Sequence, residues 1–256
     1  MGAISETLRS RMIGAAIAAC VGVADGAAAG SEQRLTYTVQ MSPYGTIGNY
    51  QSAKYKNGDD TTVTTEAHIK VSLAGVVLYR LETSRVERQI ADRLVYFHGV
   101  TIENGKSVEV AGKAMGEHFI ITSPSGTVTA PGTIRTSDPW SAGAPGVDMV
   151  FMPDTGVVTR VHTSGGEQTS MTIGGASVRV RRYQINSADG REQYEVWMDD
   201  QRTPVMFNIV DRDGTTTFTL VRRSSRSSRG EDVWSRSASF ASQARGPPMS
   251  AFVTSN

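Results

Sequence analysis

The chain has 256 residues, of which 39% are hydrophobic and 20% are charged. Its 26 basic and 25 acidic residues leave a formal net charge of +1, which argues against the strongly basic surface of a nucleic-acid-binding protein, so we expect no nucleic-acid partner. The single cysteine excludes an internal disulfide framework and a multi-cysteine zinc module.

Residues 1–29 have the pattern of a secretory signal peptide. Arg9 and Arg11 supply positive charge, residues 12–24 are uncharged and apolar or small, and residues 27–29 are three alanines that match a cleavage site. The apolar run is shorter than the ~20 residues that span a bilayer. The pattern therefore predicts an exported, periplasmic protein with no transmembrane helix in its mature chain.

An alternative for the same segment is lipidation at Cys20. Residues 17–20, Ile-Ala-Ala-Cys, resemble a bacterial lipobox, which would anchor a lipoprotein through Cys20. The apolar run before Cys20 is short, however, and a better-formed cleavage site lies downstream at Ala29. We favour plain secretion and keep the lipoprotein as the alternative.

Residues 30–221 alternate apolar and polar side chains, as strands with one buried face do. Clear examples are residues 35–41, 69–73, 194–198 and 205–209. Turn dipeptides separate such runs, and the strongest are Asn57-Gly58, Asn104-Gly105, Asp189-Gly190 and Asp213-Gly214. We therefore predict a single all-β domain of about a dozen strands, an antiparallel meander with little helix.

Two segments carry a weak helical signal. Ser84 and Glu87 have capping-box spacing, but residues 84–92 lack an apolar stripe, so we interpret them as strand or bulge, with one helical turn as the alternative. Residues 137–140 could begin a short helical turn. They lie within residues 130–148, a stretch rich in proline and glycine that predicts a long loop across one face or end of the sheet.

Residues 222–256 differ in composition from the rest of the chain. Ten of these 35 residues are serine and six are arginine, with Glu231 and Asp232 as the only acids. Such a segment buries little apolar area, so we predict a disordered tail. A tether to an anionic surface is the alternative, because Trp234 and Phe240 are residue types that favour a membrane interface.

The sequence contains no recognised catalytic or metal-binding motif. The histidines are isolated at no metal-ligand spacing: His68, His98, His118 and His162. The acid pairs Asp59-Asp60 and Asp199-Asp200 fall at a turn and at a strand end, where neighbouring side chains do not face each other across a cleft. We assign no catalytic residue, metal or cofactor and favour a non-enzymatic protein. A hydrolase is the weaker alternative, its site assembled around His68, His98 or His118 with Asp199 or Glu82.

Several aromatic residues could line an apolar groove or fill the core of the sheet. They are Trp140, Tyr183, Tyr194, Trp197, Phe207 and Phe218. Core packing is the commoner use of such residues. Trp140, Trp197 and Phe207 are the weak candidates for ligand binding.

Three segments resemble an uncharacterised family of secreted proteobacterial proteins, known as a domain of unknown function. They are Gly45-Thr46-Ile47-Gly48, residues 94–112 and residues 196–220, and the resemblance covers about residues 33–221. The family is similar in shape to lipoprotein-carrier half-barrels. The resemblance therefore implies a meander curled into a half-barrel or open barrel, with no catalytic residue to carry over.

Two main hypotheses for function follow. The first is a cell-envelope protein that binds or carries a lipid or other apolar ligand within the curved sheet, which requires an open cavity. The second is a structural or interaction module of the periplasm, in which the sheet is packed and an exposed edge pairs with an envelope protein.

Overall fold

The computed structural model describes residues 30–141, 147–188, 190, 193–211 and 214–228. Its elements, in chain order, are β1 (Gly30–Met41), β2 (Gly45–Asn57), β3 (Asp60–Leu73), β4 (Val76–Ile90), β5 (Arg93–Glu103), β6 (Lys106–Met115), β7 (His118–Ser123), β8 (Gly126–Pro131), β9 (Arg135–Thr136), the 3-10 helix η1 (Pro139–Ser141), β10 (Met149–Phe151), β11 (Val158–Ile173), β12 (Ala176–Ser187), β13 (Gln193–Asp199), β14 (Pro204–Asp211) and β15 (Gly214–Ser228). No helix in these residues is long and apolar enough to cross a membrane.

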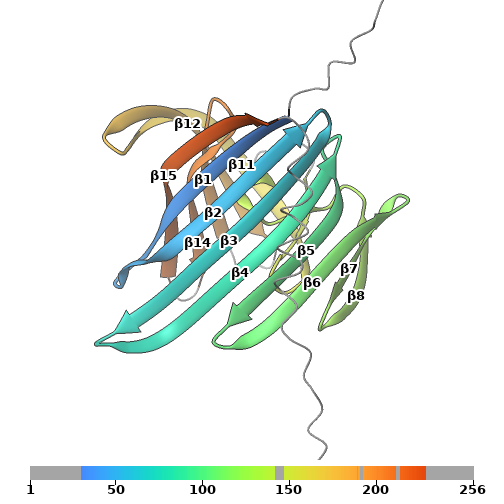
Figure 1. Cartoon of the computed structure of the whole chain (residues 1–256), viewed down its shortest axis with the longest axis horizontal. Coiled ribbons are helices and arrows are strands. Elements are labelled where there is room, and N and C mark those ends of the chain that lie inside the picture. The colour runs from blue at the N-terminus through green and yellow to red at the C-terminus, as the bar shows by residue number, and fades with distance from the viewer. Residues whose placement is uncertain (1–29, 142–146, 189, 191–192, 212–213, 229–256) are drawn as a thin grey trace, which may run out of the picture.

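All fifteen strands form one sheet in the order β8-β7-β6-β5-β4-β3-β2-β1-β15-β14-β13-β12-β11-β10-β9. Sequential neighbours pair antiparallel, and β1 pairs with β15, so each half of the chain is a meander. The predicted all-β antiparallel meander is confirmed, except that β9 and β10 are parallel. The sheet curls, with the strands β1 to β6 in front of β11 to β14 in Figure 1. It remains open, because its two edge strands, β8 and β9, do not pair with each other.

The predicted turn dipeptides account for some of the hairpins. Asn104 and Gly105 form the turn between β5 and β6 with φ values of 48° and 84°, as a type I′ turn requires. The turn between β2 and β3 is displaced by one residue, because Asn57 pairs with Asp60 and leaves Gly58 and Asp59 as the turn. The dipeptides at 189–190 and 213–214 include residues outside the described part of the chain.

Two apolar clusters fill the concave side of the sheet. The first joins β1, β2 and β3 to β12, β13, β14 and β15, and its ring cluster consists of Tyr37, Tyr50, Phe207 and Phe218. Phe207 stacks on Phe218 with ring centroids 4.2 Å apart, and the two tyrosine rings meet edge to face at 5.6 Å. Such contacts add to the free energy of burial itself.

The second cluster joins strands from the two ends of the sheet. Phe97 of β5 and Phe119 of β7 both contact Phe151 of β10, with centroids 5.0 and 6.0 Å apart. Val110, Ile121 and other buried residues complete the cluster. Side-chain packing therefore draws the ends of the curl together where no strand pairing does.

Three predictions about the elements can be compared with the structure. Residues 84–90 are part of β4, with a bulge at Arg88 and Gln89, which confirms the interpretation as strand or bulge. A short helical turn, η1, forms at Pro139–Ser141. The prediction that disorder begins at residue 222 is wrong for residues 222–228, because they continue β15 and pair with β1. The segments 1–29, with Cys20, and 229–256 lie outside the described residues.

Candidate functional site

The concave side of the sheet is crossed by residues 134–140, which we call the plug. Ile134, Thr136 and Asp138 of the plug are buried, and the backbone amide of Ser137 donates a hydrogen bond to the carbonyl of Phe151 at 3.0 Å. Trp140 packs against the first apolar cluster. Residues 134–140 of the predicted proline- and glycine-rich loop thus pack into the interior of the sheet, while residues 142–146 of that loop lie outside the described residues.

A cluster of charged side chains joins the plug to β4. Asp138 accepts a hydrogen bond from Arg85 Nη1 at 3.2 Å, and the Thr136 hydroxyl donates to Glu87 Oε2 at 3.2 Å. Arg85 Nε also donates to the Thr83 hydroxyl at 3.0 Å. Glu87 and Asp138 are both buried, so two carboxyl groups lie in the interior of the sheet. Arg85 is paired with Asp138, and the charges of Arg85 and Arg135 both act on Glu87.

Burial changes the proton affinity of both carboxyl groups. It disfavours the charged form and raises the pKa of Glu87 to about 8, with the negative charge of Asp138 as the second cause. The pKa of Asp138 is also raised by burial, against the lowering effect of Arg85. At neutral pH Glu87 therefore holds a proton, and the positive charge of Arg85 balances the negative charge of Asp138.

Some polar atoms of this region have no hydrogen-bond partner among the described residues. They include Glu87 Oε1, Ser52 Oγ and Arg135 Nη1. Unpaired buried polar groups cost free energy and are commonly satisfied by internal water. The cluster can hold a proton on a buried carboxyl group and balance the negative charge of another with a guanidinium.

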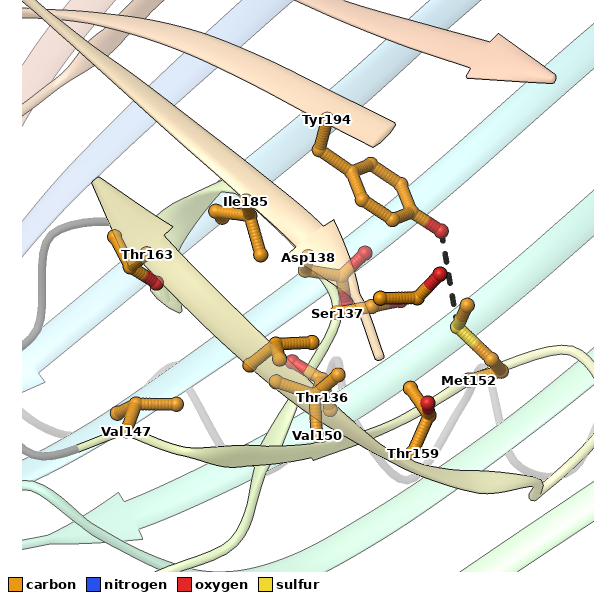
Figure 2. A pocket seen from close by; sticks show the side chains of 12 residues that line it. Thr136, Ser137, Asp138, Val147, Val150, Met152, Thr159, Thr163, Ile185 and Tyr194 are labelled. Atoms are coloured by element: carbon orange, nitrogen blue, oxygen red, sulfur yellow. Dashed lines mark hydrogen bonds between the residues drawn. The ribbon is translucent and has the colours of Figure 1, made fainter. Parts of the chain in front are cut away.

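A small hollow lies beside the plug and is shown in Figure 2. Its walls come from the plug, β10, β11, β12 and β13, and include Asp138, Thr136, Val161, Ile185 and Tyr194. The Tyr194 hydroxyl reaches across to Met152 Sδ at 3.7 Å, as the dashed line in Figure 2 marks. The cavity volume is about 10 Å³, close to what a single water molecule needs.

The aromatic residues predicted as ligand candidates do not converge on one groove. Phe207 is buried in the first cluster, and Trp140 packs against the same cluster. Trp197 follows the buried Val196 on β13 and therefore lies on the outer face of the sheet, where the guanidinium of Arg182 sits 5.6 Å from its ring. Phe207 and Trp140 therefore pack in or against the first cluster, whereas Trp197 lies apart from it on the opposite face.

The histidines and acids considered for a hydrolase are equally dispersed. His68, His98 and His118 each follow or precede a buried residue on their strands, so they lie on the outer face. His162 is exposed on β11, between the half-buried Val161 and Thr163. His98 Nε2 lies 2.9 Å from Glu109 Oε1, and Glu82 pairs with Arg80. Asp199 accepts bonds from the amides of the turn between β13 and β14 and from Arg223. Within the described residues no three potential ligands gather as a metal site.

The buried acid cluster was missed by sequence reasoning. Glu87 was considered only as a helix-capping residue, although Arg85 and Glu87 alternate with outward positions on β4. Charged residues at inward positions of a strand were the available signal. Asp138 gave no comparable signal, because its burial depends on the course of the plug.

Comparison with known proteins supports the fold and names a family. A family described as a domain of unknown function, DUF6134, matches residues 39–222, and no curated protein sequence matches the chain. The crystal structure of a beta-barrel-like protein of DUF1849 from Brucella abortus has a TM-score of 0.59 at 13% identity, covering 76% of this chain and 98% of that one. This identity shows a shared fold alone. A DUF1329 family protein from Desulfovibrio piger has a TM-score of 0.21 at 6% identity, covering 81% and 89%, and implies nothing about this chain.

Proposed function

Since the chain belongs to the DUF6134 family, a domain of unknown function, we propose a function from its own geometry: a non-enzymatic interaction module of the cell envelope. In this proposal the protein binds partners on its outside and holds no ligand within the curl. The signal pattern of residues 1–29 supports export to the envelope.

The packed interior carries the proposal. The two apolar clusters pack on the concave side, and the plug adds hydrogen bonds to β4 there. A carrier of a lipid or other apolar ligand needs a pocket of roughly 300–1,000 Å³. The hollow beside the plug, at about 10 Å³, is far below that range. The geometry therefore favours the interaction module over the lipid carrier.

The free edge of β8 is the best place for a protein partner. β8 pairs with β7, and no described strand pairs with its other side. Residues 123–132 contain no charged side chain, whereas natural sheet edges are commonly protected by charge. An extended segment of another protein can add to such an edge through main-chain hydrogen bonds.

Ligand uptake tests the packed interior. The full chain is incubated with a dansyl-labelled fatty acid, and binding is followed by fluorescence and native mass spectrometry, with a known fatty-acid carrier as the positive control. We expect no saturable binding and no complex of one ligand per chain. A saturable one-to-one complex would overturn the proposal and restore the carrier.

Site-specific photo-crosslinking tests the edge. A photoreactive amino acid replaces Thr127 on β8 or, as the matched control, Tyr96 on the exposed face of β5, and the protein is crosslinked in intact cells. We expect a discrete adduct from position 127, none from position 96, and loss of the adduct when Thr129→Lys adds a charge to the edge. Equal adducts from both positions, or none from either, would contradict strand addition at β8.

A further inference from the structure

The β3–β4 hairpin extends beyond the sheet as a two-stranded ribbon. Pairing of β3 with β2 ends at Ile69, and pairing of β4 with β5 ends at Leu81. The two strands continue to pair with each other as far as Leu73 and Val76. Residues 70–79 therefore lack a third strand on either side, whereas the backbone of Arg80 is still hydrogen-bonded to Asn104 in the turn between β5 and β6. The hairpin projects past its neighbours at the lower left of Figure 1.

The end of this ribbon is apolar and exposed. Leu73, Val76, Val77 and Leu78 leave 60%, 62%, 49% and 51% of their surfaces accessible, and we call these four residues the apolar tip. No charged residue occurs between Ser72 and Tyr79 in the sequence. The other exposed large hydrophobic residues of the described chain are spread over separate strands and turns. A concentrated apolar patch of this kind indicates an interaction site.

Two basic residues flank the tip where the ribbon leaves the sheet. Lys70 and Arg80 are directly opposite each other in the ladder, and both are exposed. Like charges in this arrangement repel each other. Arg80 Nη2 is paired with Glu82 Oε1 at 2.5 Å, whereas Lys70 forms no ion pair with any described residue. The neck of the ribbon therefore carries positive charge without full compensation.

We propose that the apolar tip inserts into the surface of a lipid bilayer that carries anionic headgroups. Aliphatic side chains at the tip enter the boundary of the acyl chains, and Lys70 and Arg80 lie at the level of the headgroups. A stable protein interface requires about 800 Å² from each partner, a broad surface that the end of a two-stranded ribbon does not offer. This surface is separate from the β8 edge.

Vesicle flotation tests the proposal with the full chain. The vesicles consist of phosphatidylcholine alone or of phosphatidylcholine mixed with phosphatidylglycerol. Val76→Thr combined with Val77→Thr keeps the shape and strand propensity of the tip but makes it polar. We expect this variant to partition at least about tenfold more weakly onto the mixed vesicles. The matched control, Val157→Thr with Val221→Thr, alters two exposed valines elsewhere and should bind like the wild type.

The basic neck is tested by Lys70→Gln. We expect about fivefold weaker binding to the mixed vesicles and no change on phosphatidylcholine alone, because one cation is removed from the headgroup level. Lys113→Gln on β6 is the control. All variants share both terminal segments, so ratios between them isolate the hairpin, and circular dichroism confirms that each is folded.

Two outcomes would overturn the proposal. The first is equal partitioning of the wild type and the tip variant, and the second is no binding of the wild type to either vesicle. Neither outcome bears on the proposal of an interaction module. That proposal is contradicted only if the fatty-acid experiment finds a one-to-one complex or the β8 edge gives no specific adduct.

Discussion

Replacing Glu87 with glutamine is expected to remove much of the pH dependence of stability that the interior imposes. The pKa of Glu87 is raised from 4.5 to about 8, so the folded chain keeps a proton that the unfolded chain releases. By linkage, the free energy of unfolding of the wild type falls as pH rises through this window and levels off above it. At about 1.4 kcal/mol per pH unit, the total is on the order of 5 kcal/mol.

The variant is informative because glutamine is a neutral substitute of the same shape. Its carbonyl oxygen can still accept the hydrogen bond that the Thr136 hydroxyl donates to Glu87. Asp138, whose pKa is also raised, remains in both proteins and contributes in the same direction. The two stabilities should therefore be similar near pH 5 and diverge up to about pH 8, with the variant the more stable.

Urea unfolding followed by tryptophan fluorescence, at intervals between about pH 5 and 9, measures this difference. Glu66→Gln is the matched control, because Glu66 lies on the outer face of the neighbouring strand β3, opposite Ser84 of β4. Its stability curve should run parallel to that of the wild type. If the Glu87→Gln curve is parallel as well, Glu87 does not hold a proton in the folded protein and the reasoning fails.

Three further substitutions test the packing. Phe207→Ala should cost about 3–5 kcal/mol in urea unfolding, because it leaves a cavity in the ring cluster; a cost below about 1 kcal/mol would contradict that packing. Arg85→Met should cost about 3–5 kcal/mol by leaving Asp138 buried without its cation, and adding Asp138→Asn should recover much of the loss. If the losses of stability from Arg85→Met and Asp138→Asn simply add in the double variant, the two side chains are not coupled. Gly112→Ala should lower the thermal midpoint at a cost of about 1–3 kcal/mol, since its Cβ would lie 2.4 Å from the Phe119 ring, and an unchanged midpoint would refute the contact.

Local pattern was sufficient to predict the class of fold but not every turn. Alternation identifies strands because successive side chains point to opposite faces, and Asn104-Gly105 has residue types that accept positive φ. The turn between β4 and β5 consists of Ala91 and Asp92 with φ values of 47° and 62°. Alanine carries no signal for that conformation, so pairing of the flanking strands places the turn.

Long-range pairing explains the remaining errors of sequence reasoning. Serine- and arginine-rich composition predicted disorder from residue 222, yet residues 222–228 are held by β1, almost two hundred residues earlier in the chain. The contact between Arg85 and Asp138 spans 53 residues. Whether the curl is open or filled depends on such contacts, so the sequence alone could not distinguish a carrier from a packed module.

The position at which the core ends gives the apolar tip its significance. Val71 and Leu73 lie on the same face of β3, but Val71 is 5% exposed and Leu73 is 60% exposed. Between them the ribbon passes beyond the sheet, so apolar residues farther out add nothing to the core. Polar residues would serve the hairpin equally well there and would reduce the risk of aggregation. The aliphatic side chains of Val76, Val77 and Leu78 therefore require a reason outside the folded domain, and a lipid surface supplies one.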